Sequence, residues 1–414
     1  MATSSPIQPA TGKPLRPERT RLGIWLLLAI FLAASAWHLH IIDLRLPANQ
    51  SDLLPRWLGT RLALHGQDPY SLQLLGPLEK DYNTPRLPFL YPAPVVILLA
   101  PLAPLSMQSA RTVFFAIVTP LLALSFWLCM GNLRVAATRS NRALVLLAAL
   151  LSWPVVWGLR MEQPTLLVAA LLFVSWWLLA RGHQFAPGLL LALTTIKPQL
   201  VLPFFLWLLL WAILQRRWTL IASFSGTLAL LLLAAEKIVP GWFPRWRDSL
   251  RNYNRVEHAA PALQHFFGHG VGLPLTILLT LSAGYTLWRL RRCTADSPQF
   301  ATALGIALAI PLFVVPTEPL MIYNNTLLFP AVLLLLYMKP ESRLASSLRW
   351  LAFAQLALDF LLVAVAVLGE TLRGPAPAWI SLPFLDFLLA ALLTAALTAE
   401  TLSRKTIPAP APHV

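Results

Sequence analysis

Asp52 is a carboxylate in a polar segment between long apolar stretches, and its side chain could accept a proton from a substrate hydroxyl. Ser51 or Asp52 could equally cap the short helix expected before Gly66, and the residues alone favour the cap. Farther along this segment, Asp68 and Tyr70 combine turn chemistry with side chains that could contact a substrate. A proton acceptor and a helix cap are therefore two interpretations of the same carboxylate.

Lys197 is the most informative basic residue, because it interrupts an apolar stretch with no acidic residue beside it in the sequence. A lysine within a membrane span is costly, so it usually lines a cavity or meets a partner. We interpret Lys197 as a contact to a phosphate; the alternative is a side chain that snorkels to the outer surface. Gln163 and Arg160 are expected to line the same cavity, although Arg160 could be an anchor at the membrane interface.

The composition is that of a membrane protein. Of the 414 residues, 57% are hydrophobic and 12% are charged, whereas a soluble domain carries about 25% charged residues. The net charge of +15 fits an excess of Lys and Arg in cytosolic loops better than it fits nucleic-acid binding. Cys129 and Cys293 fall near expected cytosolic ends of spans, which argues against a disulfide. We therefore expect an all-α, polytopic membrane protein that binds no nucleic acid.

The distribution of Lys and Arg orients the helices. It places the tails 1–21 and 403–414 in the cytosol and the loops 43–108 and 239–270 outside, as in a multi-pass plasma-membrane protein. Residues 89–106 contain four prolines and are expected to lie in the outer interface, because an additional span there would move later arginines outside. Twelve spans are expected, at 22–42, 109–130, 143–159, 164–180, 185–196, 199–214, 218–238, 271–289, 300–317, 322–338, 347–368 and 379–400.

Several short motifs, in this order, resemble those of glycosyltransferase family 87. The opening motifs are Ser51-Asp52, Gly66-Gln67-Asp68-Pro69-Tyr70 and Tyr91-Pro92-Ala93-Pro94. Later segments of the family are similar to Trp153-Pro154 with Glu162-Gln163, and to Thr195-Ile196-Lys197-Pro198. The resemblance covers about the first 340 residues, so a catalytic membrane module is expected over 22–340, followed by a helix pair over 341–402.

The chain departs from the family pattern at two places. Glu162 stands where a glycine is usual, and a histidine expected near Asn324 is absent. The role of that histidine could pass to one of several other residues: Asn324, Asn325, His258, His265 or His269. The spacing of the three histidines does not follow a helical metal-binding pattern, so no metal site is expected.

The resemblance implies a fold of the GT-C superfamily and an activity. A hexose, mannose foremost, would pass from a polyprenyl-phosphate-linked donor to a lipid or glycan acceptor on the extracytoplasmic side, with inversion. Asp52 would be the general base, and no cofactor is implied. Donor and substrate binding would fall to Lys197, Gln163, Arg160, Asp68, Tyr70, Tyr91, His258 and Asn324. Tyr91 could instead be only an interfacial anchor.

A transporter or flippase of a lipid-linked sugar is the alternative function, because it would share the many spans and the buried charges. Transporters often carry broken helices at corresponding positions of two repeats. The sequence shows one clear break, at Lys197-Pro198, without a matching second one. The long polar first loop, with a carboxylate near its start, also favours the transferase.

Overall fold

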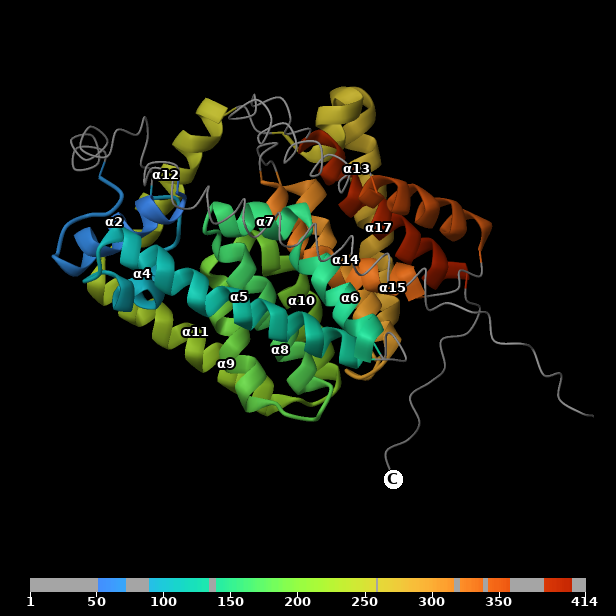
Figure 1. Ribbon diagram of the computed structural model, residues 1–414, viewed down its shortest axis with the longest axis horizontal. Coiled ribbons are helices and arrows are strands. Elements are labelled where there is room, and N and C mark those ends of the chain that lie inside the picture. The colour runs from blue at the N-terminus through green and yellow to red at the C-terminus, as the bar shows by residue number, and fades with distance from the viewer. Residues whose placement is uncertain are drawn as a thin grey trace, which may run out of the picture. The chain divides into compact units, whose positions relative to one another are not determined.

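The computed structural model describes residues 51–71, 89–133, 139–257, 260–315, 321–337, 342–357 and 383–403 (Figure 1). Helices fill most of these ranges and no strand occurs within them, so the all-α prediction is confirmed for this part of the chain. The span expected at 22–42, the tail 1–21, residues 404–414 and His258 lie outside the described residues.

The helices differ in length and in how they are connected. In chain order they are α2 (Leu53–Leu64), α4 (Pro94–Leu99), η2 (Ala100–Leu102), α5 (Met107–Asn132), α6 (Arg139–Leu150), α7 (Trp153–Arg160), α8 (Pro164–Leu179), α9 (Phe185–Leu193), η3 (Thr194–Ile196), α10 (Pro198–Leu214), α11 (Trp218–Ile238), α12 (Trp242–Glu257), α13 (Ala262–Leu290), α14 (Pro298–Val314), η4 (Ile322–Leu328), α15 (Phe329–Tyr337) and α17 (Pro383–Ser403). A further helix covers 343–357. The η elements are 3₁₀ helices.

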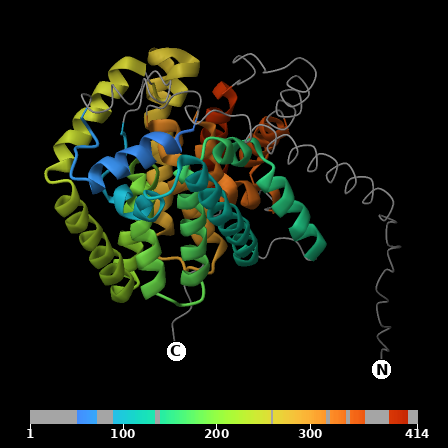
Figure 2. The same cartoon turned by 60° about the vertical axis from the view of Figure 1, so that its left-hand side comes forward.

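The segment expected to lie in the interface, 89–106, forms only α4 and η2, which are too short to cross a bilayer. Its prolines lack the N–H that a longer helix would need. In Figures 1 and 2, α2 and α4 lie side by side. Gly59 of α2 allows a close approach, since a Cβ at that position would collide with the ring of Phe89.

One expected span is a broken helix. Residues 143–159 belong to α6 and α7, which are bent by 49°. Pro154 accounts for the break, because in a continuous helix its ring would collide with the carbonyl of Leu150. The break changes the direction of α7, whose C-terminal end leads directly to Gln163.

A second break separates α9 from α10. The 3₁₀ helix η3 follows α9, and Lys197 precedes Pro198, the first residue of α10. In α9, before this break, Gly188 allows close packing against α11. A Cβ at Gly188 would lie 2.7 Å from the carbonyl oxygen of Leu220. Small residues at helix contacts are typical of membrane bundles.

The expected loop 239–270 is largely helical. It contains α12, and α13 begins at Ala262, earlier than the span expected at 271–289. Gly268, with a φ of +69°, interrupts the helical conformation within α13. Trp246 of α12 donates its indole N–H to the carbonyl oxygen of Leu90 at 2.9 Å, which joins α12 to the segment before α4.

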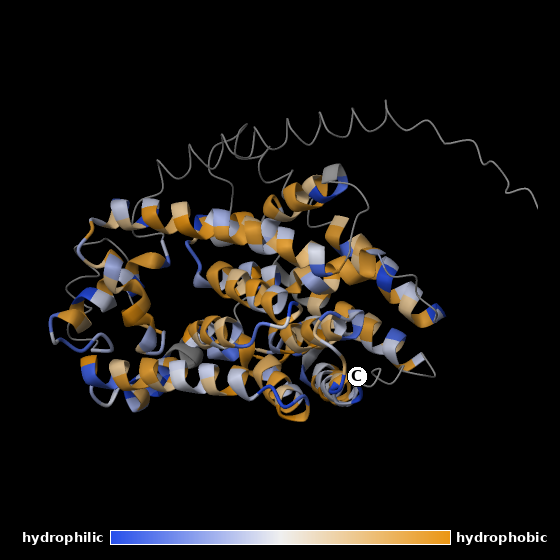
Figure 3. Cartoon of the chain, turned by 90° about the horizontal axis from the view of Figure 1, so that it is seen from below, coloured by the Kyte–Doolittle hydropathy of each residue, from blue (hydrophilic) through white to orange (hydrophobic). Residues whose placement is uncertain are grey.

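The helices of the interior differ from those at the surface. Residues on every side of α14 are buried, as expected for a helix that is apolar all round. On α11 and α13, by contrast, Leu230 is 69% exposed and Leu281 is 68% exposed. Figure 3 shows that most helices consist largely of hydrophobic residues. Large apolar side chains exposed on such helices are what a lipid-facing surface requires.

Within the described residues, three helices are long and apolar enough to cross a membrane: α5, α11 and α13. The bent pair α6–α7 makes a fourth if it counts as one span. Six further apolar segments are 10 to 17 residues long, short of the roughly 20 residues that a bilayer requires. A helical membrane protein is thus supported, and the number of twelve spans stays a prediction.

Candidate functional site

Asp52 immediately precedes α2, but its side chain does not cap that helix. The cap is the hydroxyl of Ser51, which accepts the backbone N–H of Leu53 at 3.1 Å. The carboxylate of Asp52 instead accepts a hydrogen bond from the side-chain amide of Gln163. Of the two interpretations of this carboxylate, the structure therefore assigns the cap to Ser51 and leaves Asp52 available for chemistry.

Gln163 connects Asp52 to Lys197. The ammonium of Lys197 donates to the side-chain oxygen of Gln163 at 2.9 Å and to the hydroxyl of Thr165 at 2.8 Å. Thr165 in turn donates to the side-chain oxygen of Asn324 at 2.9 Å. Lys197 is only 4% exposed, so it does not snorkel to the surface. Four residues expected to form the site thus belong to one hydrogen-bonded chain.

Two tyrosine rings lie beside the ammonium of Lys197. Its nitrogen is 4.9 Å from the ring centre of Tyr323 and 5.9 Å from that of Tyr91, distances at which a cation is attracted to an aromatic ring. Tyr323 reaches this place because Gly158 of α7 allows a close approach, its absent Cβ falling 3.1 Å from that of Tyr323. Tyr91 therefore lies beside Lys197, and its role as a substrate contact stays a prediction.

Arg56 is the second cation near Asp52 and is 2% exposed. It donates to the hydroxyl of Tyr91 and to the backbone carbonyl of Glu162, each at 2.7 Å. Asp52 and Arg56 are four residues apart, a spacing that places them on one side of the start of α2. Arg56 was not among the predicted site residues, although its spacing from Asp52 was a signal that could have found it.

Asp68 and Tyr70 make contacts that position Tyr91 and the first polar segment. The hydroxyl of Tyr70 donates to the carbonyl oxygen of Tyr91 at 2.8 Å. Asp68 accepts the backbone N–H of Tyr70 at 3.0 Å and forms an ion pair with Arg245 of α12 at 2.9 Å. These contacts agree with the turn interpretation, and they hold the first polar segment against Tyr91 and α12.

Among the other predicted residues, Arg160 and His269 have described contacts within their own helices. The guanidinium of Arg160 lies 5.0 Å from the ring centre of Trp157, as suits an anchor at the interface. His269 pairs with Gln264 at 3.2 Å within α13. Asn324, one candidate for the role of the missing histidine, accepts a hydrogen bond from Thr165, which is bonded to Lys197.

Burial and nearby charges oppose each other at Asp52, which lies in the polar segment outside the expected spans. Burial raises the pKa of its carboxyl above the ordinary value, while Arg56, Lys197 and the amide of Gln163 lower it. A carboxylate with a raised pKa is a stronger base, and the two cations favour a negatively charged group in its vicinity. The cluster thus combines a proton acceptor with a site for an anion.

Arg111 and Glu162 form a buried ion pair beside this cluster that the sequence analysis did not predict. Their side chains are 3% and 0% exposed, and the distance from the Arg111 Nε to the Glu162 Oε1 is 2.6 Å. An arginine inside the expected span 109–130 was a signal for such a pair, because a charged residue there needs a partner.

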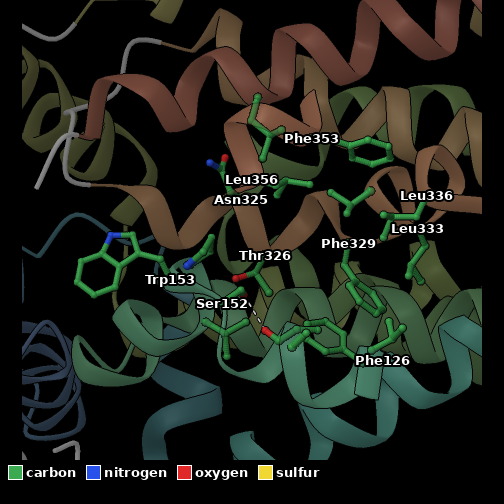
Figure 4. A pocket seen from close by; sticks show the side chains of 17 residues that line it. Phe126, Ser152, Trp153, Asn325, Thr326, Phe329, Leu333, Leu336, Phe353 and Leu356 are labelled. Atoms are coloured by element: carbon green, nitrogen blue, oxygen red, sulfur yellow. Dashed lines mark hydrogen bonds between the residues drawn. The ribbon is translucent and has the colours of Figure 1, made fainter. Parts of the chain in front are cut away.

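A large apolar pocket lies beside η4 (Figure 4). Asn325 and Thr326 line it, one and two residues after Asn324. The rest of its wall is almost entirely apolar and comes from α5, α6, α7, α15, the helix over 343–357 and α17. The pocket has a cavity volume of about 360 Å³. The hydroxyl of Thr326 is buried and has no hydrogen-bond partner among the described residues.

A comparison with family models matches residues 89–317, more than half of the chain, to the model of glycosyltransferase family 87. The matched range is narrower than the first 340 residues expected from the motifs. It includes Tyr91, Gln163 and Lys197, whereas Asp52 and Asn324 lie outside it. No curated protein matches the chain.

Proposed function

Because the chain belongs to glycosyltransferase family 87, we propose that it transfers a hexose, mannose foremost, from a polyprenyl-phosphate donor. The acceptor is a lipid or glycan hydroxyl on the extracytoplasmic side of the membrane. Family membership makes the protein a glycosyltransferase, and the donor, the sugar, the side of the membrane and a GT-C fold are the proposal. The observation that most supports the proposal is the hydrogen-bonded connection from Asp52, through the side chain of Gln163, to the buried Lys197.

The proposed reaction needs a base on one side of the sugar and a cation on the other. The acceptor oxygen attacks the anomeric carbon as Asp52 removes its proton, and the bond from that carbon to the lipid phosphate breaks. The electron pair of that bond leaves with the phosphate, where charge develops, and Lys197 stabilises it. Within the described residues Lys197 has two hydrogen-bond acceptors, so its third N–H is available to a phosphate oxygen. A single displacement of this kind inverts the anomeric centre.

The apolar pocket supports a lipid-linked donor. Its apolar walls suit an isoprenoid chain, and η4 joins it to the residues around Lys197. A phosphate held at Lys197 would thus have an apolar pocket close by for the lipid attached to it. A water-soluble nucleotide sugar would make no use of such a pocket.

The donor can be tested with the purified protein in detergent. We expect transfer from a polyprenyl-phosphate mannose and none from a nucleotide-activated mannose at the same concentration. Donors of shorter isoprenoid chain should have a higher KM, because they leave part of the pocket unfilled. Transfer from the nucleotide sugar alone would contradict the proposed donor. Movement of the lipid-linked sugar across liposomes without transfer would establish the flippase instead.

The orientation of the protein can be tested by cysteine labelling in intact cells. We expect Asn141→Cys to react only after the membrane is opened, because the arginines around it place 131–142 in the cytosol. The exposed Gln67 provides the matched control, since Gln67→Cys should react with an impermeant maleimide from outside. Cys293→Ser removes the half-buried native thiol first, and Cys129 is buried. Labelling of residue 141 from outside would mean that 89–106 crosses the membrane.

A further inference from the structure

Glu162 adopts a backbone conformation that normally belongs to glycine. Its φ is +50°, in the left-handed region. At the end of α7, Gln163 donates its backbone N–H to the carbonyl of Gly158 at 2.8 Å, and Glu162 donates to that of Leu159 at 2.9 Å. This pair of bonds defines a Schellman motif, in which the left-handed residue is usually glycine. The geometry thus gives a physical reason for the glycine expected here.

The side chain of Glu162 is fully buried and both of its carboxylate oxygens are occupied. One accepts from Arg111, and the other accepts from the hydroxyl of Ser51. The hydroxyl that Glu162 holds is the one that caps α2, immediately before Asp52. The backbone carbonyl of Glu162 holds Arg56, also on α2. With no free oxygen and no exposed surface, Glu162 is poorly suited to be the base itself.

We propose that Glu162 is a positioning residue that takes the place of a glycine and fastens the start of α2 to the end of α7. This inference rests on the proposed function, because what it positions is the base, Asp52, against Gln163. A glycine would allow the same turn but would leave Ser51 without its acceptor. Arg111 contributes to this attachment, because its positive charge balances the buried carboxylate of Glu162.

The kinetic test replaces Glu162 by glycine. Arg111 is replaced by methionine at the same time, so that the buried partner of Glu162 is not left charged. In Glu162→Gly combined with Arg111→Met the turn persists, but Ser51 and Asp52 lose their anchor. We expect kcat to fall about 10- to 100-fold, because small displacements of reacting groups are costly, while KM for the donor changes little. Glu162→Gln keeps a hydrogen-bond partner for Ser51 and should retain more activity than the double variant. Glu400→Gln, at another buried glutamate, is the matched control and should keep its kcat.

A second measurement is independent of activity. Asp52→Cys with Gln163→Cys places two thiols where the side chains now meet, so a short thiol cross-linker should join them rapidly. In the Glu162→Gly and Arg111→Met background, we expect the rate of cross-linking to fall about tenfold, in line with the kinetic effect. An unchanged cross-linking rate would overturn the inference. If the wild type transfers no sugar, the proposed function fails, and the cross-linking rate still decides the role of Glu162.

Discussion

Asp52→Asn is expected to lower kcat about 10²- to 10⁴-fold, the usual contribution of a general base. Asparagine has the shape of aspartate and can still accept the amide of Gln163, but it cannot take the proton of the acceptor hydroxyl. Stability should change little, because Ser51 caps α2. The measurement is transfer from a labelled polyprenyl-phosphate sugar, together with Tm in detergent.

The pH dependence provides a second readout of the same variant. Burial raises the pKa of Asp52, so the basic form is gained as pH rises through a value above the ordinary aspartate range. In the wild type, kcat/KM should increase with pH along this acidic limb, which lies above the usual pKa of about 3.9. In Asp52→Asn the limb should be absent. A limb that persists in the variant would belong to another group.

Normal turnover by Asp52→Asn would reject Asp52 as the base. The other candidate carboxylates would then be Asp43, Asp68 and Glu162, and their surroundings differ. Glu162 has both oxygens occupied, and Asp68 is paired with Arg245. Asp43 lies outside the described residues. Each of these could be tested by the same exchange of carboxylate for amide.

Lys197→Met is expected to lower kcat/KM for the donor by about 10²-fold, because a charged contact to a developing phosphate is lost. Methionine fills much of the same volume and carries no charge, so burial at this position no longer requires the partners Gln163 and Thr165. The variant should therefore fold. The measurement is the initial rate at sub-saturating donor, with Tm as the test of folding.

A matched control for Lys197 is present on α11. Lys237 lies in the last turn of that helix and is exposed, so Lys237→Met removes the same charge away from the site. We expect the control to retain the wild-type rate. Lys197→Arg keeps the charge but has a different shape, and should recover only part of the activity. An unchanged rate in Lys197→Met would mean that the lysine contributes only to packing.

Much of the class and of the site follows from local properties of the sequence. Long apolar runs predict helices in a membrane protein, and α11 covers the expected range 218–238 because nothing in that run interrupts a helix. Lys197 was identifiable because a charged side chain is costly within an apolar stretch, which makes it a candidate for function. The family resemblance supplied the role of a base for Asp52, which the residues alone did not favour over a cap.

Other features depend on contacts between distant residues, and only the tertiary structure decided them. Both Ser51 with Glu162 and Asp52 with Gln163 are separated by 111 positions. The cap at Ser51 is a local contact, but only the tertiary structure shows that the carboxylate of Asp52 is engaged by Gln163. The position of Arg111 indicated that it needs a partner, but only packing identified that partner as Glu162, and the left-handed turn at Glu162 has no local signature. The sequence determined which residues are costly to bury, and packing determined which partners satisfy them.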